Sequence, residues 1–443
     1  MIGEEVRTAH EELVRRGTGL GAACVAAAEA TGRQRAGSDA HAAMDDWENR
    51  FLSLFPYTEV VTHFQAVGRT QADPALVRRL SAVPADRHDA FLAAWLPMTC
   101  DQETGGYVTY AGLRPHLLAA EADLDEDADL DEDADPAPPH GGGRDRLRSR
   151  LDELTVAVLG DLLRTEAATA GLGATTPAVR TRLRATARLL VLCGELAPSH
   201  PIDPSVTADV AAALARTQEP LEPLAEASVR AAKTVLELVS PSLARTVARS
   251  LLPVTCLHDE IMFIRSIQVF EALYEQIGLA VTESRDALLE ERLDEAADAL
   301  AAVTDRMTVL PALFRLLGTM PVEVFAVIRG YTSGRSAVQS RSYRRIEAAC
   351  APHPPSGVAD SLWTGPTLQE VWTDVRTRPG ADRLTEQLRR LDSSWRGMKR
   401  SHWGITLRII GEVPGTGGTA GASYLKTTSE TPLFPALTGK GER

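Results

Sequence analysis

The sequence has few aromatic residues, no long apolar run and no apolar leader segment. Aromatic residues make up 5% of the 443 positions, although 44% of the residues are hydrophobic, enough for a sizeable core. No uninterrupted apolar stretch approaches the roughly 20 residues that cross a bilayer, and the opening residues, MIGEEVRTAHEELVRRG, are charged and amphipathic. We therefore expect no signal peptide, no membrane partner and a cytoplasmic protein.

Disulfide frameworks, structural zinc sites and nucleic-acid binding are also disfavoured. The five cysteines are scattered without a CxxC pair, which is typical of proteins in a reducing cytoplasm. The net charge of −13 is opposite to the basic footprint of a nucleic-acid-binding protein. We expect no nucleic-acid partner.

Much of the negative charge lies in one acidic run. In residues 121–135, EADLDEDADLDEDAD, the hexapeptide DLDEDA occurs twice in tandem, and PAPPHGGG follows. The run lacks the glycine and the terminal bidentate glutamate of an EF-hand loop. We interpret it as a solvated, flexible linker, with weak cation binding as the alternative.

What the sequence has in abundance is helical periodicity. Ala, Leu, Arg, Glu and Asp dominate most segments, and strand-like alternation is rare, so we predict an all-α protein. The helix expected over 287–320 should pack antiparallel to the helix that precedes it, and 351–380 should be a loop or a short helix. The clearest predicted helices are 144–168, 223–239, 257–276, 287–320 and 391–410.

The stretch 257–276, LHDEIMFIRSIQVFEALYEQ, predicts a helix with a strongly apolar face. Asp259 and Glu260 favour the positive end of the helix dipole, and Thr255 can cap it. Arg265 interrupts the apolar run, and we expect it to have a surface or interface role. On its own this pattern is more typical of core packing than of a site. The apolar face consists of Phe263, Ile267, Phe270, Tyr274 and Ile277.

A second candidate is His402, which shares a helical face with Met398, Ile405 and Ile409. A lone histidine on an apolar face is usually satisfied within a core. Here, however, a glycine-rich loop follows, GTGGTAG at 415–421, whose backbone N–H groups and threonine hydroxyl can approach a ligand closely. It is not a phosphate loop, because GKS or GKT is missing. The histidine fits haem ligation with loop closure over a substrate, and it also fits a plain end of a helix.

A third candidate is Arg329, at the end of an apolar run in VFAVIRGYTSGRSAVQSRSYRRIE, 324–347. An arginine in this setting either pairs with an acidic side chain or holds a carboxylate in two-point fashion. The residues alone leave both interpretations open.

Together these segments resemble the tryptophan 2,3-dioxygenase family. HDEIMFIRSIQVFEALYEQI resembles the family's HDE helix, and SAVQSRSYRRIE resembles its SGFQS-x-x-[YF]R-x-x-E segment. His402 with RIIG and GTGGTAGASYL resembles the haem-histidine helix and its glycine loop, and GGYVTYAGL at 105–113 resembles the stretch before the HDE helix. The segments follow the family's order and cover under half of the chain.

The resemblance implies a division of the chain around a helical-bundle, haem-binding oxygenase core of this family's type, with extra helical regions. The inserted region would cap the site, mediate assembly or bind another protein. The predicted ranges are a helical N-terminal extension at 1–104, the core at 105–117 plus 257–434, an acidic and Pro/Gly linker at 118–143, an inserted helical region at 144–256, and a tail at 435–443.

The resemblance also implies a cofactor and a substrate clamp. The family binds b-type haem through one proximal histidine, and His402 matches that axial ligand of the iron. Arg329 matches the arginine that binds the substrate carboxylate, and Thr416 matches the threonine that contacts its α-amino end. Phe263 matches the aromatic residue that packs on the indole. A tryptophan-like amino acid and O2 are therefore the expected partners.

Other matched positions differ from the family or concern assembly. Phe325 falls where the family usually has tyrosine, so a hydroxyl is lost from the substrate pocket. Tyr107 and Val108 match a Tyr-Leu pair that reaches the pocket of a neighbouring subunit, although the tyrosine before GGY is Thr104 here. If that contact is kept, the protein is a homo-oligomer.

The main departure is Ile267, which occupies the place of the family's distal histidine, so no catalytic residue is assigned with certainty. Isoleucine can neither accept a hydrogen bond nor take a proton. An apolar wall here is compatible with cleavage of tryptophan to N-formylkynurenine. It also fits a substituted indole or a changed outcome, such as monooxygenation or ring rearrangement in secondary metabolism. A non-catalytic helical haem sensor or interaction protein is the third alternative.

Overall fold

The computed structural model describes residues 8–9, 11–12, 22–50, 55–84, 90–100, 142–171, 176–197, 202–216, 220–331, 340–352, 362–411 and 421–438. Every regular element in these ranges is a helix and none is a strand, which confirms the predicted all-α class. No single described helix combines the length and apolarity needed to cross a membrane. One bent pair, Leu293–Leu317 with Val322–Tyr331, passes that test by length and composition only.

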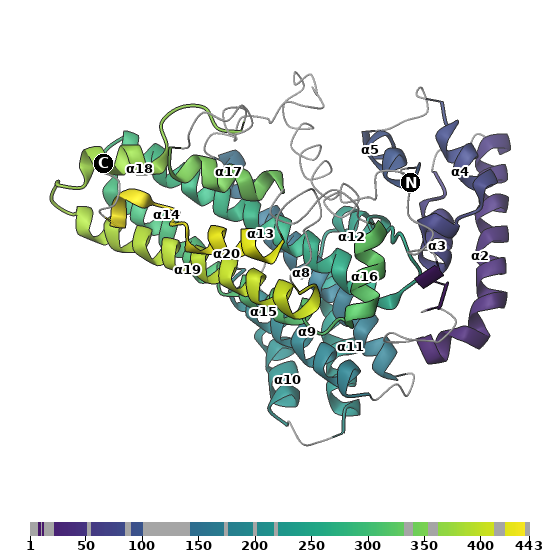
Figure 1. Ribbon diagram of the computed structural model, residues 1–443. Coiled ribbons are helices and arrows are strands. Elements are labelled where there is room, and N and C mark those ends of the chain that lie inside the picture. The colour runs from purple at the N-terminus through teal and green to yellow at the C-terminus, as the bar shows by residue number, and fades with distance from the viewer. Residues whose placement is uncertain are drawn as a thin grey trace.

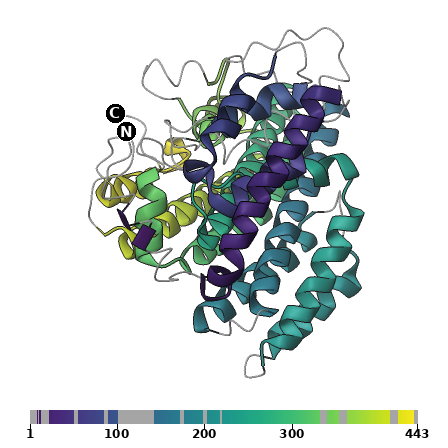
Figure 2. The same cartoon turned by 90° about the vertical axis from the view of Figure 1, so that its right-hand side faces the viewer.

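The N-terminal helices form a block with its own apolar cluster, at the right of Figure 1. Figure 2 looks onto this block, with α2 running across its front. Segment 249–254 ties it to the rest of the chain. Leu252 belongs to the same cluster, and the Arg249 guanidinium lies 3.9 Å from the centre of the Tyr57 ring. The elements are α2 (Ala22–Arg50), α3 (Tyr57–Val67), η1 (Arg69–Gln71), α4 (Pro74–Ser81) and α5 (Ala90–Cys100).

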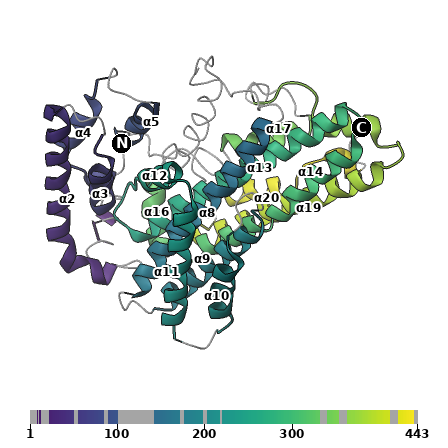
Figure 3. The same ribbon diagram turned by 180° about the vertical axis from the view of Figure 1, so that it is seen from behind.

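Most of the remaining helices share one continuous hydrophobic core. Figure 3 shows α8 to α11 in the middle of the molecule and the α13, α14 and α19 bundle extending away from the N-terminal block. The first group is α8 (Gly142–Gly171), α9 (Pro177–Glu195), α10 (Pro204–Ala215), α11 (Glu222–Leu238) and α12 (Pro241–Arg249). The second group is α13 (His258–Leu289), α14 (Leu293–Arg306), α15 (Val309–Leu317), α16 (Val322–Tyr331), α17 (Arg341–Cys350), α18 (Leu368–Val375), α19 (Ala381–Ile409), α20 (Ala422–Glu430) and η5 (Pro435–Thr438).

The predicted helices are present, but three boundaries differ. Helix α13 continues to Leu289, and α19 begins at Ala381, ten residues before the predicted start. The single helix predicted over 287–320 is interrupted, because Glu291 adopts a φ of 62° and reverses the chain. Helix α14 then folds back against α13, as expected, and α15 follows as a separate helix.

A series of polar side-chain contacts runs along the interface of α8 and α13. Arg144 pairs with Asp286 at 2.8 Å, and Gln276 donates to Asp152 at 3.0 Å. Arg148 also pairs with Glu283, and at the other end His258 Nε2 lies 3.2 Å from Glu166 Oε1. Because the residue numbers rise on one helix as they fall on the other, the two helices are antiparallel along their length.

Arg265 lies in this interface, so the expected surface role is wrong. Its side chain is 1% exposed and pairs with Asp161 of α8. It also donates to Ser250 Oγ at 3.1 Å and to the Val247 carbonyl at 3.0 Å. Burial alone would raise the pKa of Asp161, but the Arg265 and Arg164 guanidinium groups hold it below its usual value. The partner is 104 positions away, so local periodicity could not reveal it.

The start of α13 is also held differently from the prediction. Leu257, not Thr255, is the N-cap, and it makes no side-chain cap hydrogen bond. The Glu260 carboxylate accepts hydrogen bonds from the backbone N–H groups of Val254 and Thr255, at 2.8 and 2.7 Å. Asp259, which is 1% exposed, pairs with Arg182 of α9 at 2.5 Å. The acidic first turn therefore anchors α13 to its neighbours as well as favouring the helix dipole.

Candidate functional site

Helices α13 and α16 bring two of the predicted substrate-contacting residues together. The half-buried rings of Phe263 and Phe325 lie edge to face, with centroids 6.0 Å apart. Ile267, one turn further along α13, is 3% exposed and belongs to the main core. Half-buried Arg329 follows Phe325 by one turn of α16. These four residues therefore lie on two adjoining helices, as the resemblance implies for a substrate wall.

His402 is half-buried on α19, between the buried residues Met398 and Ile409 of the same helix. Its ring stacks on Phe314 of α15, with centroids 5.1 Å apart and an angle of 15° between the planes. Phe314 in turn contacts Phe270 of α13, at 4.8 Å between centroids. An aromatic series therefore connects the histidine to the apolar face of α13. No direct ring contact joins His402 to Phe263 or Phe325 among the described residues.

The imidazole of His402 has the protonation state that a metal ligand needs. Burial lowers its pKa to about 4, so the ring is neutral near pH 7 and one nitrogen keeps a free lone pair. Within the described ranges its ring forms no hydrogen bond or ion pair with the protein. The donor chemistry therefore fits a haem iron held by a single histidine. The same ranges contain no group of three His, Cys, Asp or Glu arranged to hold a metal ion.

Sequence reasoning missed a buried polar cluster one turn before His402. Lys399 of α19, 6% exposed, pairs with Glu347 of α17 at 2.5 Å. The same carboxylate oxygen accepts hydrogen bonds from Trp395 Nε1 and Tyr343 Oη, both at 3.2 Å. Burial raises the pKa of Tyr343, so its hydroxyl stays protonated and can donate. The available signal was the Tyr and Glu of SRSYRRIE, four residues apart on one helical face.

Two predicted site residues cannot be placed. Tyr107 and Thr416 lie outside the described residues, together with Val108, Thr104 and most of the glycine-rich loop. Their proposed contacts with substrate and with a neighbouring subunit stay predictions.

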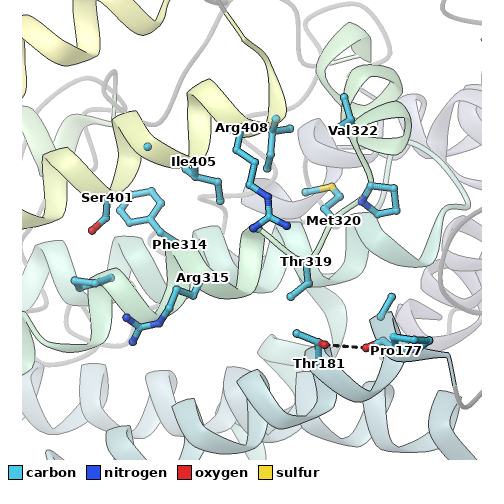
Figure 4. Close-up of a pocket in the computed structure, with 16 residues that line it drawn as sticks. Pro177, Thr181, Phe314, Arg315, Thr319, Met320, Val322, Ser401, Ile405 and Arg408 are labelled. Atoms are coloured by element: carbon cyan, nitrogen blue, oxygen red, sulfur yellow. Dashed lines mark hydrogen bonds between the residues drawn. The ribbon is translucent and has the colours of Figure 1, made fainter.

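A cavity of about 910 Å³ opens on another side of α19 (Figure 4). It lies between the start of α9, helix α15, the turn before α16 and the residues Ser401, Gly404, Ile405 and Arg408 of α19. None of Phe263, Ile267, Phe325, Arg329 or His402 lines it. Phe314 is the link, because it lines the cavity and also stacks on His402.

Fold and site together define an all-helical protein with a neutral histidine in an aromatic setting on α19. No family model matches the sequence. The chain is, however, similar to curated proteins named tryptophan 2,3-dioxygenase. That of Anaeromyxobacter sp. (strain K) is 31% identical over 231 residues, covering 41% of this chain and 85% of the relative. Those of Anaeromyxobacter dehalogenans (strain 2CP-C) and Polaromonas sp. (strain JS666) are 29% and 28% identical, covering 41% and 42% of this chain and 85% and 80% of the relatives.

The chain belongs to the tryptophan 2,3-dioxygenase family, and it is therefore an oxidoreductase. The resemblance inferred from the sequence motifs is confirmed. The similarity to the first of these relatives covers 41% of this chain, so more than half of the chain lies outside it.

Proposed function

We propose that the protein is a haem-dependent oxygenase that inserts O2 into the indole ring of tryptophan or a close derivative. The observation that carries the proposal is His402, neutral and half-buried on α19 and joined through Phe314 to the aromatic face of α13. The names of the curated relatives support tryptophan and dioxygenation as the substrate and reaction.

His402 would hold haem b through its neutral imidazole, and a bound haem iron would supply the capacity to bind and activate O2. The chain's own task is then to bind, orient and desolvate the amino acid. The Phe263 and Phe325 rings would pack on the indole, because aromatic rings attract one another in edge-to-face and offset arrangements. Arg329 would hold the substrate carboxylate in two-point fashion, and Thr416 would contact its amino group.

Ile267 favours one alternative within the same fold. Its apolar side chain excludes water but offers no acceptor for an indole N–H and no group that moves a proton. The wall therefore suits a substituted indole or a reaction that adds a single oxygen atom, as well as dioxygenation. Mass spectrometry of the product formed from isotopically labelled O2 separates these outcomes, since dioxygenation adds two labelled atoms and monooxygenation adds one.

The assignment of His402 is tested by haem binding. His402→Ala should abolish stoichiometric haem uptake and the absorption band of the ferrous protein. The matched control is His41→Ala, in the N-terminal block, which should bind haem like the unaltered protein. Normal haem uptake by the His402 variant would exclude this residue as the axial ligand.

A homo-oligomer in which Tyr107 completes the pocket of a neighbouring subunit belongs to the same proposal. If it is correct, mixing an Arg329→Gln variant with a Tyr107→Phe variant should restore part of the activity. In mixed oligomers some pockets would combine an intact Arg329 with an intact Tyr107 from the other chain.

A further inference from the structure

The cavity in Figure 4 has a charge opposite to that of the molecule around it. The chain carries a net charge of −13, yet no Asp or Glu is among the described residues that line the cavity. Its charged residues are two arginines, Arg408 from α19 and Arg315 from α15. A cation in this cavity would find no counter-charge, whereas an anion would find two.

Both guanidinium groups are available to a ligand. Within the described ranges neither Arg315 nor Arg408 forms an ion pair or hydrogen bond with the protein. Figure 4 shows Arg408 extending from α19 toward Thr319 at the centre of the cavity. The Thr181 and Thr319 hydroxyls instead donate to carbonyls of their own helices, at 2.8 and 2.7 Å. The arginines are therefore the donors left for an occupant.

The rest of the wall is largely apolar. Phe314, Met320 and Ile405 form part of it, and Val322 is 51% exposed at its edge. An apolar body placed here would cover surface that is otherwise in contact with water. The volume of about 910 Å³ lies within the range of about 300–1,000 Å³ typical of small-molecule pockets.

Gly404 keeps the cavity open. It lies in the interior of α19, where glycine destabilises a helix relative to alanine. A Cβ atom added at this position would meet no atom within 4 Å, so packing does not require glycine. A larger side chain at 404 would, however, extend into the cavity.

We propose that this cavity binds a hydrophobic carboxylate, a small molecule with an apolar or aromatic body and one anionic group. Arg408 binds the carboxylate, Arg315 adds positive charge to the wall, and the apolar wall covers the body. The lack of any acidic lining residue disfavours a free amino acid, whose ammonium group would have no partner. The site is distinct from the proposed tryptophan pocket, and its occupant contacts Phe314, the residue that stacks on His402.

Isothermal titration calorimetry tests the charge requirement, with 2-naphthoate as the probe and neutral 2-naphthamide as its matched control. We expect one naphthoate per chain and at least about tenfold weaker binding of the amide, which is the effect of losing one charged hydrogen bond. Arg408→Gln should weaken naphthoate binding by about tenfold, and Arg315→Gln should weaken it less, because Arg315 adds charge without a direct hydrogen bond. Arg400→Gln, which removes an exposed arginine of α19 outside the cavity, should leave it unchanged. Equal binding of acid and amide, or equal effects of the Arg408 and Arg400 variants, would overturn the proposal.

Gly404 supplies a test that does not depend on charge. Gly404→Leu should weaken naphthoate binding by narrowing the cavity that residue 404 lines, while Gly404→Ala retains it. Circular dichroism should show both variants as helical and at least as heat-stable as the unaltered protein, because nothing obstructs a side chain there and both residues favour a helix more than glycine does. Unchanged naphthoate binding by a folded Gly404→Leu variant would place the ligand elsewhere. Because the titration needs no haem, it can also be carried out on the His402→Ala variant. There it tests naphthoate binding by the cavity independently of the proposed oxygenase activity.

Discussion

At the scale of single residues, the buried pair of Arg265 and Asp161 shows that an apolar helix pattern can include a buried charge whose partner the pattern does not identify. Periodicity placed Arg265 on a core helix, but it could not reveal that α8 presents Asp161 to it. The Lys399 and Glu347 pair beside His402 escaped notice for the same reason, because its members are 52 positions apart. Phe263, Phe325 and His402 were easier, since each lies in a motif whose spacing is local.

The first prediction concerns the loss of stability when the ion pair between Arg265 and Asp161 is broken. Arg265→Met leaves the buried Asp161 carboxylate with only the mostly exposed Arg164 as a partner, and it should lower the free energy of unfolding by up to about 3–5 kcal/mol. The double variant Asp161→Leu with Arg265→Met should recover most of that loss, because no uncompensated charge remains. Urea unfolding of the single and double variants provides the measurement. A double variant as unstable as the single one would show that the loss comes from packing.

The second prediction is a pH dependence with a defined sign. The folded-state pKa of Asp161 lies below its unfolded value, because the Arg265 and Arg164 charges outweigh the effect of burial. The unfolded state therefore binds the proton more readily, and the pair's contribution is present above the unfolded pKa. It is lost as the pH falls through the folded pKa. The stability difference between the unaltered protein and the Arg265→Met variant should thus shrink in acid, and a difference that stays constant would contradict the assignment.

At the scale of elements, the helices follow from sequence patterns, whereas several of their ends do not. The apolar residues of 287–320 keep the same helical spacing on both sides of Glu291, so periodicity alone predicts one helix. The break is a Schellman motif, in which the N–H groups of Arg292 and Glu291 donate to the carbonyls of Ala287 and Leu288. Glycine is the usual residue at the left-handed position of this motif. Its absence removed the signal by which the turn could have been predicted.

The third prediction concerns Glu291, which occupies the left-handed position of this motif in place of the usual glycine. Glu291→Gly should raise the free energy of unfolding by about 0.5–1 kcal/mol, since a left-handed conformation is strained for a residue with a Cβ. The change also removes an exposed ion pair with Arg378, which contributes little. Glu291→Gln is the control, because it removes the pair and keeps the strain. Thermal or urea unfolding in which both variants behave alike would show that the turn is unstrained.

At the scale of the whole molecule, the extra helices are packed as part of the core. The sequence motifs suggested that 144–256 is an inserted region, since it separates two segments that resemble the family. Helix α8 nevertheless lies along α13 from Arg144 beside Asp286 to Glu166 beside His258. Its apolar residues belong to the same cluster as Ile267 and Trp395. Helices from the region predicted as inserted therefore pack against α13 as part of one core.

The last prediction tests that dependence by native-state hydrogen exchange. If α8 and α13 form one cooperative unit, their slowest amides should exchange with the same free energy, because opening either helix exposes the shared core and the buried Arg265. The N-terminal block of α2 to α5 has a separate apolar cluster, tied to the rest through segment 249–254, and should open at a lower free energy. Mass spectrometry of peptides from α3, α8 and α13 separates the three. If α8 opened at a much lower free energy than α13, region 144–256 would behave as an independent insertion. The polar contacts between α8 and α13 would then add little to the stability of the site.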